Sequence, residues 1–515
     1  MIILLLLSAV LAEAQTGILS ERSFHVTAGS SLSRMPLSNS ITDIVISGDT
    51  IWLGTGRGLS RSTDRGRSWK NYNGTPEFGN EDVSALAVRG KDVWVATAHT
   101  VTVSDQSMPE GSGLRYSSDG GETWRVIPQP VDANNVDTLF WNAQSTIRAL
   151  GITTAINNIT YDIAIAGTSV YICSFAGMAR VSHDTGRTWH RVILPPDNLN
   201  SISRKDSLKF DLSPSGGALG LQNNLNHRAF SVMAENDSTI WIGTAGGVNE
   251  LRSRGDSVVR HTKQNNIDPI SGNFVVAIHK QSTPGGDVIW AATVNATDNT
   301  ERRGVSYTTN RGATWKQTLL GEFAHNFGFK GDTVVYVPTD NGLFRSTDQG
   351  QSWMQSGTIY DRSNRQRYTQ SVFYAAAAAG DSIWFGGADG LLMTVDSVSE
   401  DFGLNWTILH ASQPPSTAAA SYAYPNPFAP DDEVVRVHYS TGKSSTANVS
   451  LRIFDFGMNL VRTVVQNAPR EANREHDEIW DGRNQTNTIV ANGVYFYQLT
   501  IDSDEPRWGK ILVIQ

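Results

Sequence analysis

One eight-residue pattern returns five times in this chain, and it limits the possible folds more than any other feature. The pattern, S/T-x-D-x-G-x-S/T-W, occupies residues 62–69, 117–124, 182–189, 308–315 and 346–353. Its Asp can accept hydrogen bonds from nearby backbone N–H groups, and its Gly supplies the positive φ of a tight turn. The Trp then begins a strand with a large apolar side chain. The pattern predicts a repeated β-hairpin whose central side chain stabilises the turn and binds nothing, at Asp64, Asp119, Asp184, Asn310 and Asp348.

A second repeated element is an apolar strand with an aromatic residue near its centre, and it occurs seven times. Successive copies are about 42 to 49 residues apart, except for two longer intervals. The first unit divides into strands 41–47, 51–54 and 58–62, with a fourth strand from Trp69. A four-stranded antiparallel unit repeated seven times predicts an all-β fold, a seven-bladed β-propeller over residues 15–412. The aromatic centres are Trp52, Trp94, Tyr171, Trp241, Trp290, Tyr336 and Trp384.

The repeated turns resemble the Asp-box (BNR) repeats of sialidase-like and sortilin-like propellers. Strands such as 240–248 (IWIGTAGGV) also resemble the propeller repeats of bacterial two-component-regulator periplasmic domains. The resemblance implies the fold. It does not identify an activity, because this fold occurs in sialidases, glucanases, lectins, sorting receptors and scaffolds.

Charge and cysteine content exclude some classes of function. The 515 residues include 42 Lys+Arg and 50 Asp+Glu, for a net charge of −8. A field of that sign offers no general attraction to nucleic acid or to an acidic membrane. The one cysteine, Cys173, cannot form an intramolecular disulfide, and its apolar surroundings in the sequence predict a packed core thiol.

The first 14 residues, MIILLLLSAVLAEA, form an apolar run that ends in an A-x-A pattern. The run is too short to span a bilayer, and it predicts a signal peptide cleaved before Gln15. We expect no transmembrane segment in the rest of the chain. Residues 413–421 (QPPSTAAAS) lack apolar periodicity and are predicted to be a linker.

Residues 422–515 alternate apolar and polar positions in several short runs, which predicts a small β-sandwich. Four segments in order, YPNPF (424–428), IFDFG (453–457), WDGRN (480–484) and NGVYFY (492–497), resemble the FlgD-like immunoglobulin-type domain and the type A C-terminal sorting domain of type IX secretion cargo. The resemblance implies type IX export machinery as a partner and a location outside a Gram-negative bacterium, secreted or on the outer-membrane surface. The same residues are also compatible with a purely structural module.

Strand order indicates which face of the propeller can bind a ligand. The Asp-containing turns join the third and fourth strands of a blade and share one face with the short turns between strands one and two. Every long connection falls on the opposite face, where insertions commonly mark a binding surface. Residues that begin the first strands should surround the channel mouth on that face. These candidate ligand-binding residues are Asp82, Asn158, His227, Arg228, Asn273, His325, Asn326, Arg367 and Tyr368.

A glycosidase of sialidase type is an alternative. It would need an arginine cluster and a Tyr nucleophile. Arg34, in a Ser-Arg-Met-Pro segment, lies where such enzymes have an R-I-P motif, and Tyr360 with Arg362 could act as later partners. These matches are weak and no acidic partner is evident. The 11 His residues show no metal-binding spacing, and no cofactor motif is present.

We therefore expect a secreted or surface propeller that binds a glycan or a protein, with no cofactor, no metal and no nucleic acid. The alternatives are a propeller glycoside hydrolase and a component of the envelope or of the secretion machinery.

Overall fold

The computed structural model describes residues 33, 35–133, 138–149, 151–211, 224–363, 366–398, 401–411, 421–430, 433–472 and 475–514. The predicted signal peptide, Arg34 and the predicted linker up to residue 420 lie outside them. The only helix in this part of the chain is a 3-10 turn, η1 (Leu225–His227). None of its helices is long and apolar enough to cross a membrane.

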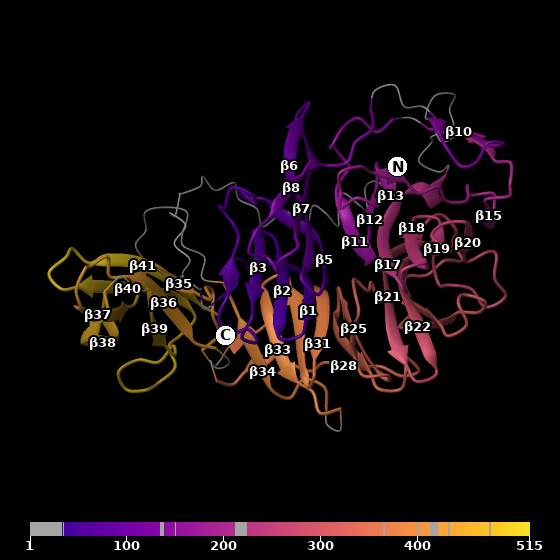
Figure 1. The fold of residues 1–515 in the computed structure, drawn as a ribbon. Helices are drawn as coiled ribbons and strands as arrows, with labels where there is room; N and C mark the ends of the chain where they lie inside the picture. Colours follow the sequence, from indigo (N-terminus) through magenta and orange to yellow (C-terminus); the bar gives the residue numbers. More distant parts are fainter. Residues whose placement is uncertain are drawn as a thin grey trace.

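Seven sheets built from consecutive antiparallel strands make up most of the described chain (Figure 1). We call them blades one to seven in chain order. Blade one contains β1 (Ile41–Ser47), β2 (Thr50–Thr55), β3 (Gly58–Ser62) and β4 (Lys70–Asn71), and blade two contains β5 (Asp82–Arg89), β6 (Asp92–Val103), β7 (Gln106–Ser117) and β8 (Arg125–Ile127). Blade three contains β11 (Thr160–Ala166), β12 (Ser169–Ser174), β13 (Met178–Ser182) and β14 (His190–Arg191). Blade four contains β17 (Ala229–Ala234), β18 (Ile240–Thr244), β19 (Gly247–Arg252) and β20 (Ser257–His261).

Blades five to seven follow the same order. Blade five contains β21 (Phe274–Thr283), β22 (Gly286–Val294), β23 (Gly304–Thr308) and β24 (Lys316–Thr318). Blade six contains β25 (Gly328–Lys330), β26 (Val334–Thr339), β27 (Gly342–Ser346) and β28 (Met354–Gln355). Blade seven contains β31 (Phe373–Ala379), β32 (Ser382–Gly387), β33 (Gly390–Val395) and β34 (Trp406–Leu409).

The blades form a closed ring because β31 of blade seven packs against β1 of blade one (Figure 1). This confirms the predicted all-β propeller fold. Asn39 fastens the junction: its Nδ2 donates to Asp389 Oδ1 at 2.9 Å, and its Oδ1 accepts from the Ala411 N–H at 2.6 Å. In the described residues each blade comes from one continuous segment, so the ring closes through side chains and loops and not through a shared blade.

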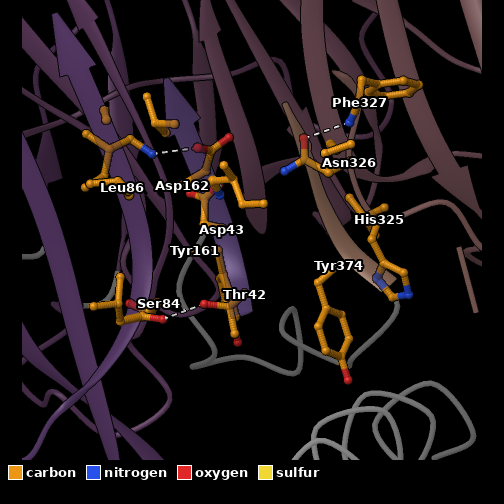
Figure 2. A pocket seen from close by; sticks show the side chains of 18 of the residues that line it. Thr42, Asp43, Ser84, Leu86, Tyr161, Asp162, His325, Asn326, Phe327 and Tyr374 are labelled. Carbon is orange, nitrogen blue, oxygen red and sulfur yellow. Dashed lines mark hydrogen bonds between the residues drawn. The ribbon is translucent and has the colours of Figure 1, made fainter. Parts of the chain in front are cut away.

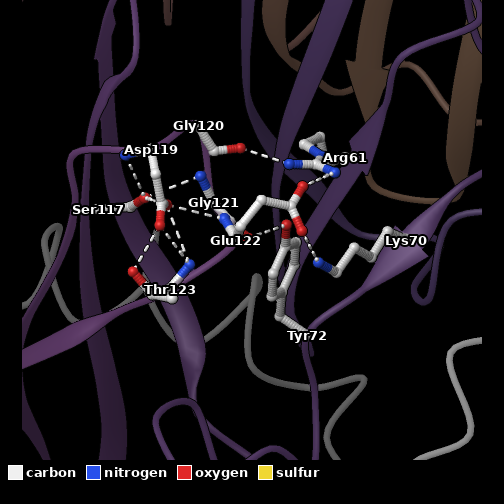
Figure 3. Close-up of polar contacts among 9 residues, drawn as sticks. All are labelled: Arg61, Lys70, Tyr72, Ser117, Asp119, Gly120, Gly121, Glu122 and Thr123. Atoms are coloured by element: carbon white, nitrogen blue, oxygen red, sulfur yellow. Dashed lines mark hydrogen bonds and ion pairs between the residues drawn. The ribbon is translucent and has the colours of Figure 1, made fainter.

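The Asp-containing turns of blades one, two, three and six have the same side-chain hydrogen bonds, which Figure 3 shows for blade two. Asp119 Oδ1 accepts from the Ser117 hydroxyl at 2.7 Å, and Oδ2 accepts from the Thr123 hydroxyl at 2.6 Å. The Gly121 N–H donates to Ser117 Oγ at 2.8 Å. These bonds hold the pKa of Asp119 well below its usual range. The turn lies beside the β5–β6 turn, where the Gly120 N–H donates to the Lys91 carbonyl.

The Gly of each turn also forms the contact between blades. A Cβ atom on Gly121 would lie 2.5 Å from Trp52 Cη2 of blade one, a distance that no Cβ can adopt. The same contact joins Gly186 to Trp94 and, across the ring junction, Gly66 to Trp384. In blade five the corresponding Gly312 faces the His261 ring of blade four instead of an indole. Sequence reasoning explained this Gly by its positive φ alone, whereas the structure adds a ring of the preceding blade.

Figure 3 also shows charge pairing at the junction of blades one and two. Glu122, in the turn of blade two, accepts hydrogen bonds from Arg61 at 2.7 Å and from Lys70 at 3.0 Å, both in blade one. The Tyr72 hydroxyl donates to the Gly121 carbonyl at 2.8 Å. The turn therefore joins neighbouring blades by packing and by polar contacts.

The two longest insertions pair with one another. The connection from blade two to three supplies β9 (Thr138–Leu139) and β10 (Thr146–Arg148), and the next connection supplies β16 (Lys209–Asp211), which pairs with β10 in parallel. β15 (Ser201–Ser203) adds a fifth strand to the outer edge of blade four. A hairpin, β29 (Tyr360–Asp361) and β30 (Gln366–Arg367), lies between blades six and seven. In Figure 1, β10 and the long β6–β7 hairpin project beyond the ends of the blades.

The C-terminal residues form two facing sheets around a separate core. Phe428 packs against Trp480 with ring centroids 5.7 Å apart, and Asn426 exchanges hydrogen bonds with the backbone of Lys510 and Leu512. The YPNPF and WDGRN segments thus help to hold this sandwich together. Its strands are β35 (Ser421–Tyr424), β36 (Val435–Ser440) and β39 (Glu475–Trp480) in one sheet, and β38 (Leu460–Arg470), β37 (Ala447–Phe454), β40 (Gly493–Ile501) and β41 (Arg507–Val513) in the other.

Adjacent glycines of one turn allow the inter-blade contact to be tested. Gly120 and Gly121 both have positive φ, but a Cβ on Gly120 would meet nothing within 4 Å. We expect Gly120→Ala to lower the free energy of unfolding by about 1–2 kcal/mol from backbone strain. Gly121→Ala should cost about 1–3 kcal/mol more because of the clash with Trp52. Urea unfolding of both variants measures the difference, and equal losses would contradict the contact.

Candidate ligand-binding channel

The innermost strands of all seven blades surround a cavity of about 1220 Å³ along the axis of the ring. Its mouth contains the β2–β3 and β32–β33 turns, at Arg57 and Asp389, and the start of β5, at Asp82. This is the end at which the insertions and the β6–β7 hairpin lie. The cavity therefore extends to the face where sequence analysis placed the binding surface.

A β-bulge near the start of the innermost strand turns additional side chains into this channel. The pairing register shifts at this point in six blades, for example between Ile41 and Asp43 and between Thr160 and Asp162. A bulge lets two successive residues depart from strict alternation. The bulged residues all border the cavity: Thr42, Ser84, Tyr161, Phe230, Val276 and Tyr374 (Figure 2).

Two carboxyl groups follow the bulges in blades one and three. Asp43 Oδ1 accepts from the Ile44 N–H at 2.8 Å, and its carboxyl also accepts from the backbone of Leu86 in blade two. Asp162 accepts from the Ile163 N–H at 2.8 Å and from the Val232 N–H of blade four at 2.7 Å. Each carboxyl joins two neighbouring innermost strands while bordering the cavity (Figure 2).

Burial is the largest influence on the pKa of both carboxyl groups. It raises the pKa of Asp43 to about 7, although the backbone hydrogen bonds lower it. Burial raises the pKa of Asp162 to about 8, and the charge of Asp43 adds to this increase. Near neutral pH the channel wall therefore carries carboxyl groups that can donate as well as accept hydrogen bonds.

Other polar side chains line the channel closer to its mouth. Burial, with a contribution from the Glu81 charge, raises the pKa of Asp82 to about 7, against the opposing charges of Arg57 and His99. His325 Nε2 lies 2.7 Å from Asp340 Oδ1, and its ring packs edge-on against Tyr374 at 5.4 Å. Asn326 Oδ1 accepts from the Phe327 N–H at 2.8 Å, the same local bond that Asp43 makes.

His99 forms a clamp at the base of the β6–β7 hairpin. Its Nδ1 lies 2.8 Å from Glu81 and its Nε2 lies 3.1 Å from Glu110. Burial lowers the pKa of His99, but the hydrogen bonds and charges of the two glutamates outweigh it, so that the pKa lies above its usual value. The clamp connects the hairpin to the residue next to Asp82 at the mouth.

Of the nine predicted ligand-binding residues, Asp82, His325 and Asn326 border the channel, and the other six do not. Asn158 is buried, where it donates to the Pro130 carbonyl and accepts from Ser174. The Asn273 amide pairs with Gln264 and Glu301. Both amides hold loops to their blades and do not reach the channel.

The remaining four predicted residues also lie elsewhere. His227 is buried in η1, where desolvation lowers its pKa to about 4. The Arg228 guanidinium lies 5.3 Å from the Phe175 ring centre. Tyr368 is buried against Phe373, and Arg367 is exposed on the β29–β30 hairpin. The sialidase-type residues Tyr360 and Arg362 belong to the same hairpin and do not border the channel.

Sequence reasoning missed Asp43, Asp162 and the bulged residues. The available signal was an Asp-Ile pair in two innermost strands, at 43–44 and 162–163. Cys173, predicted to be a packed thiol, is buried. In the described part of the chain, no cluster of three His, Cys, Asp or Glu side chains is suited to hold a metal ion.

Comparison with known proteins gives only distant likenesses. No family model and no curated protein matches the sequence. Among solved structures, similar ones are YCF48 bound to a D1 peptide (15% identity, TM-score 0.41, 73% of this chain and 99% of that one) and an ancestral GH74 enzyme (14%, 0.44, 94% and 64%). Another is PorZ, a surface component of the type IX secretion system of Porphyromonas gingivalis (14%, 0.22, 92% and 81%). At these identities the likeness concerns the fold alone.

The raised pKa of Asp162 predicts how stability depends on pH. The unfolded state loses this proton near pH 3.9, whereas the folded state retains it to about pH 8, so the free energy of unfolding should fall between these values. Asp162→Asn keeps an oxygen acceptor, as Asn326 does in blade six, and removes the titration. We expect the variant to gain stability relative to the parent as pH rises through this window.

Urea unfolding across the pH range measures this effect. Asp64→Asn is the control of opposite sign, because hydrogen bonds lower the pKa of Asp64 to about 2. Its destabilisation should be present at neutral pH and disappear as pH falls through that value. A pH-independent difference between Asp162→Asn and the parent would contradict a raised pKa.

Proposed function

We propose that this protein is a binding protein outside the cell that takes up part of a glycan or protein ligand in its propeller channel. The observation that carries this proposal is the cavity of about 1220 Å³, which extends to the face that bears the insertions. Concave sites with a few convergent polar groups are the usual form of ligand sites in proteins.

The lining suits a hydroxyl-rich or amide-rich ligand. Asp43, Asp82 and Asp162, with pKa values of about 7, 7 and 8, can donate or accept hydrogen bonds near neutral pH. Tyr161 and Tyr374 add aromatic surface to the channel lining. Sugar rings and peptide groups both combine apolar faces with paired donors and acceptors, so both ligand classes fit.

Ligand screening with matched variants tests the channel. The full-length protein is screened against glycan and peptide arrays, and each hit is measured by calorimetry with Asp82→Asn and His325→Gln. We expect each substitution to weaken binding at least about tenfold, equivalent to roughly 1.4 kcal/mol. Asp49→Asn, an exposed change in the β1–β2 turn at the far end, should leave binding unchanged. Unchanged binding by the channel variants would contradict the proposal.

A second candidate is a propeller glycoside hydrolase. The observation that favours it is Asp82, a carboxyl with a pKa of about 7 at the channel mouth, because a general acid works best with a pKa near the operating pH. Turnover of aryl glycosides or polysaccharides that disappears in Asp82→Asn would establish this function and replace the binding-only proposal. Binding of the same sugars without turnover would exclude it.

We also propose that residues 422–515 direct export by the type IX route, which places the protein in the medium or on the outer-membrane surface of a Gram-negative bacterium. The support is the set of four ordered segments that resemble sorting domains. A component of the envelope or of the secretion machinery would share this location.

Deletion of residues 422–515 in the native host tests the export proposal. We expect the truncated protein to remain in the periplasm, with a propeller that still resists protease as the full chain does. Fractionation and immunoblotting provide the measurement. Unchanged delivery to the surface would refute the proposed role of this domain.

A further inference from the structure

The four-stranded sheet of the C-terminal sandwich has a group of aromatic residues on its outer face as well as an apolar inner face. Alternate residues of β37, such as Leu451 and Ile453, point into the core and are fully buried. The intervening positions point away from the core, where polar residues are expected. Phe454, Phe496 and Trp508 occupy such positions on three neighbouring strands.

These side chains form one continuous surface. Phe454 lies opposite Phe496 in the strand register, and its ring is 5.5 Å from that of Trp508. Phe456, which follows β37, lies 6.3 Å from the Phe496 ring. Leu460 pairs with Phe454 from the other side. With Met458 in the β37–β38 turn, we call this set the aromatic face.

The aromatic face is unusually accessible. Phe456 is 78% exposed, Met458 51%, Leu460 49% and Trp508 46%. Exposed apolar residues on soluble proteins are commonly scattered, and a contiguous group of them marks an interaction surface.

Basic residues lie on the strands of this face, and acidic residues lie in the turns beside it. The outward positions of β37, β40 and β41 carry two cations, Arg452 and Lys510, and no carboxylate. Lys510 lies opposite Phe496, within the aromatic face. The acids beside the face include Asp455, whose carboxylate accepts hydrogen bonds from the Asn459 backbone and side chain, and Glu505, exposed in the β40–β41 turn.

We propose that the aromatic face docks on an anionic lipid surface. Phe, Trp, Leu and Met side chains can enter the boundary between headgroups and acyl chains, while Arg and Lys stay at the headgroup level. Basic residues close to such a surface are attracted by the negative charge of its headgroups. Lysine is depleted at the centre of protein–protein interfaces, so Lys510 within the aromatic face favours a lipid surface over a protein partner.

The net charge of −8 does not oppose this local contact strongly. At physiological ionic strength, charges more than about 8 Å from the membrane are largely screened. Most of the negative charge of the protein therefore does not repel an acidic membrane when the aromatic face is in contact with it. This inference is independent of the channel and of the export route.

Vesicle binding by the full-length protein tests the inference. Cosedimentation is measured with vesicles of phosphatidylcholine alone and of phosphatidylcholine mixed with phosphatidylglycerol. We expect binding to the mixed vesicles, weakening with salt, and much less binding to phosphatidylcholine alone. The double variant Phe456→Ser/Trp508→Ser should reduce binding at least about tenfold, and Lys510→Glu should reduce it on the anionic vesicles.

Ile479→Ser is the matched control, because Ile479 is 52% exposed on the other sheet of the same sandwich. This variant should bind vesicles as the parent does, and circular dichroism checks the folding of all variants. No vesicle binding by the parent protein, or equal binding by the double variant, would overturn the proposal. Self-association that the double variant abolishes, without vesicle binding, would instead assign the face to a second copy of the chain.

Discussion

The packing of a tryptophan against a glycine of the next blade is the contact on which the propeller depends. A sheet in the ring must bury both faces, and the indole of β2 or β6 fills the space between sheets. It can do so only where the neighbouring turn has no Cβ, as at Gly121 and Gly186. The Asp side chain preserves the turn that presents this Gly. The repeated motif therefore combines a local hydrogen-bonded turn with a contact between blades.

Closing such a ring has a consequence for its centre. Seven innermost strands cannot meet on the axis, so they leave a cavity whose wall is partly backbone. Asp43 and Asp162 satisfy N–H groups of neighbouring strands there, with burial raising the pKa of both carboxyl groups. The same groups that join the strands thus give the channel its hydrogen-bonding character, which links the stability of the ring to the chemistry of the proposed binding site.

The fold could be predicted because its determinants are local and repeated. The turn from Ser62 to Trp69 contains its own hydrogen-bonding partners, and the apolar strand around Trp52 is buried against the next copy of the same unit. The binding residues could be predicted only in part. Asp82 lies on a strand, so its position follows from the repeat. Asn158 and Asn273 lie in connections whose path depends on partners such as Pro130 and Glu301, distant in sequence.

What the sequence determined by itself was the number of strands per unit, the positions of the turns and the face on which the insertions lie, because each follows from short-range patterns. Only the tertiary structure decided which side chains enter the channel. A β-bulge changes the side of the sheet on which residues such as Thr42 and Tyr161 lie. The alternation of apolar and polar residues in the sequence does not predict this change. The pairing of β10 with β16 was likewise decided in three dimensions, since two insertions can form one sheet only after the ring has brought them together.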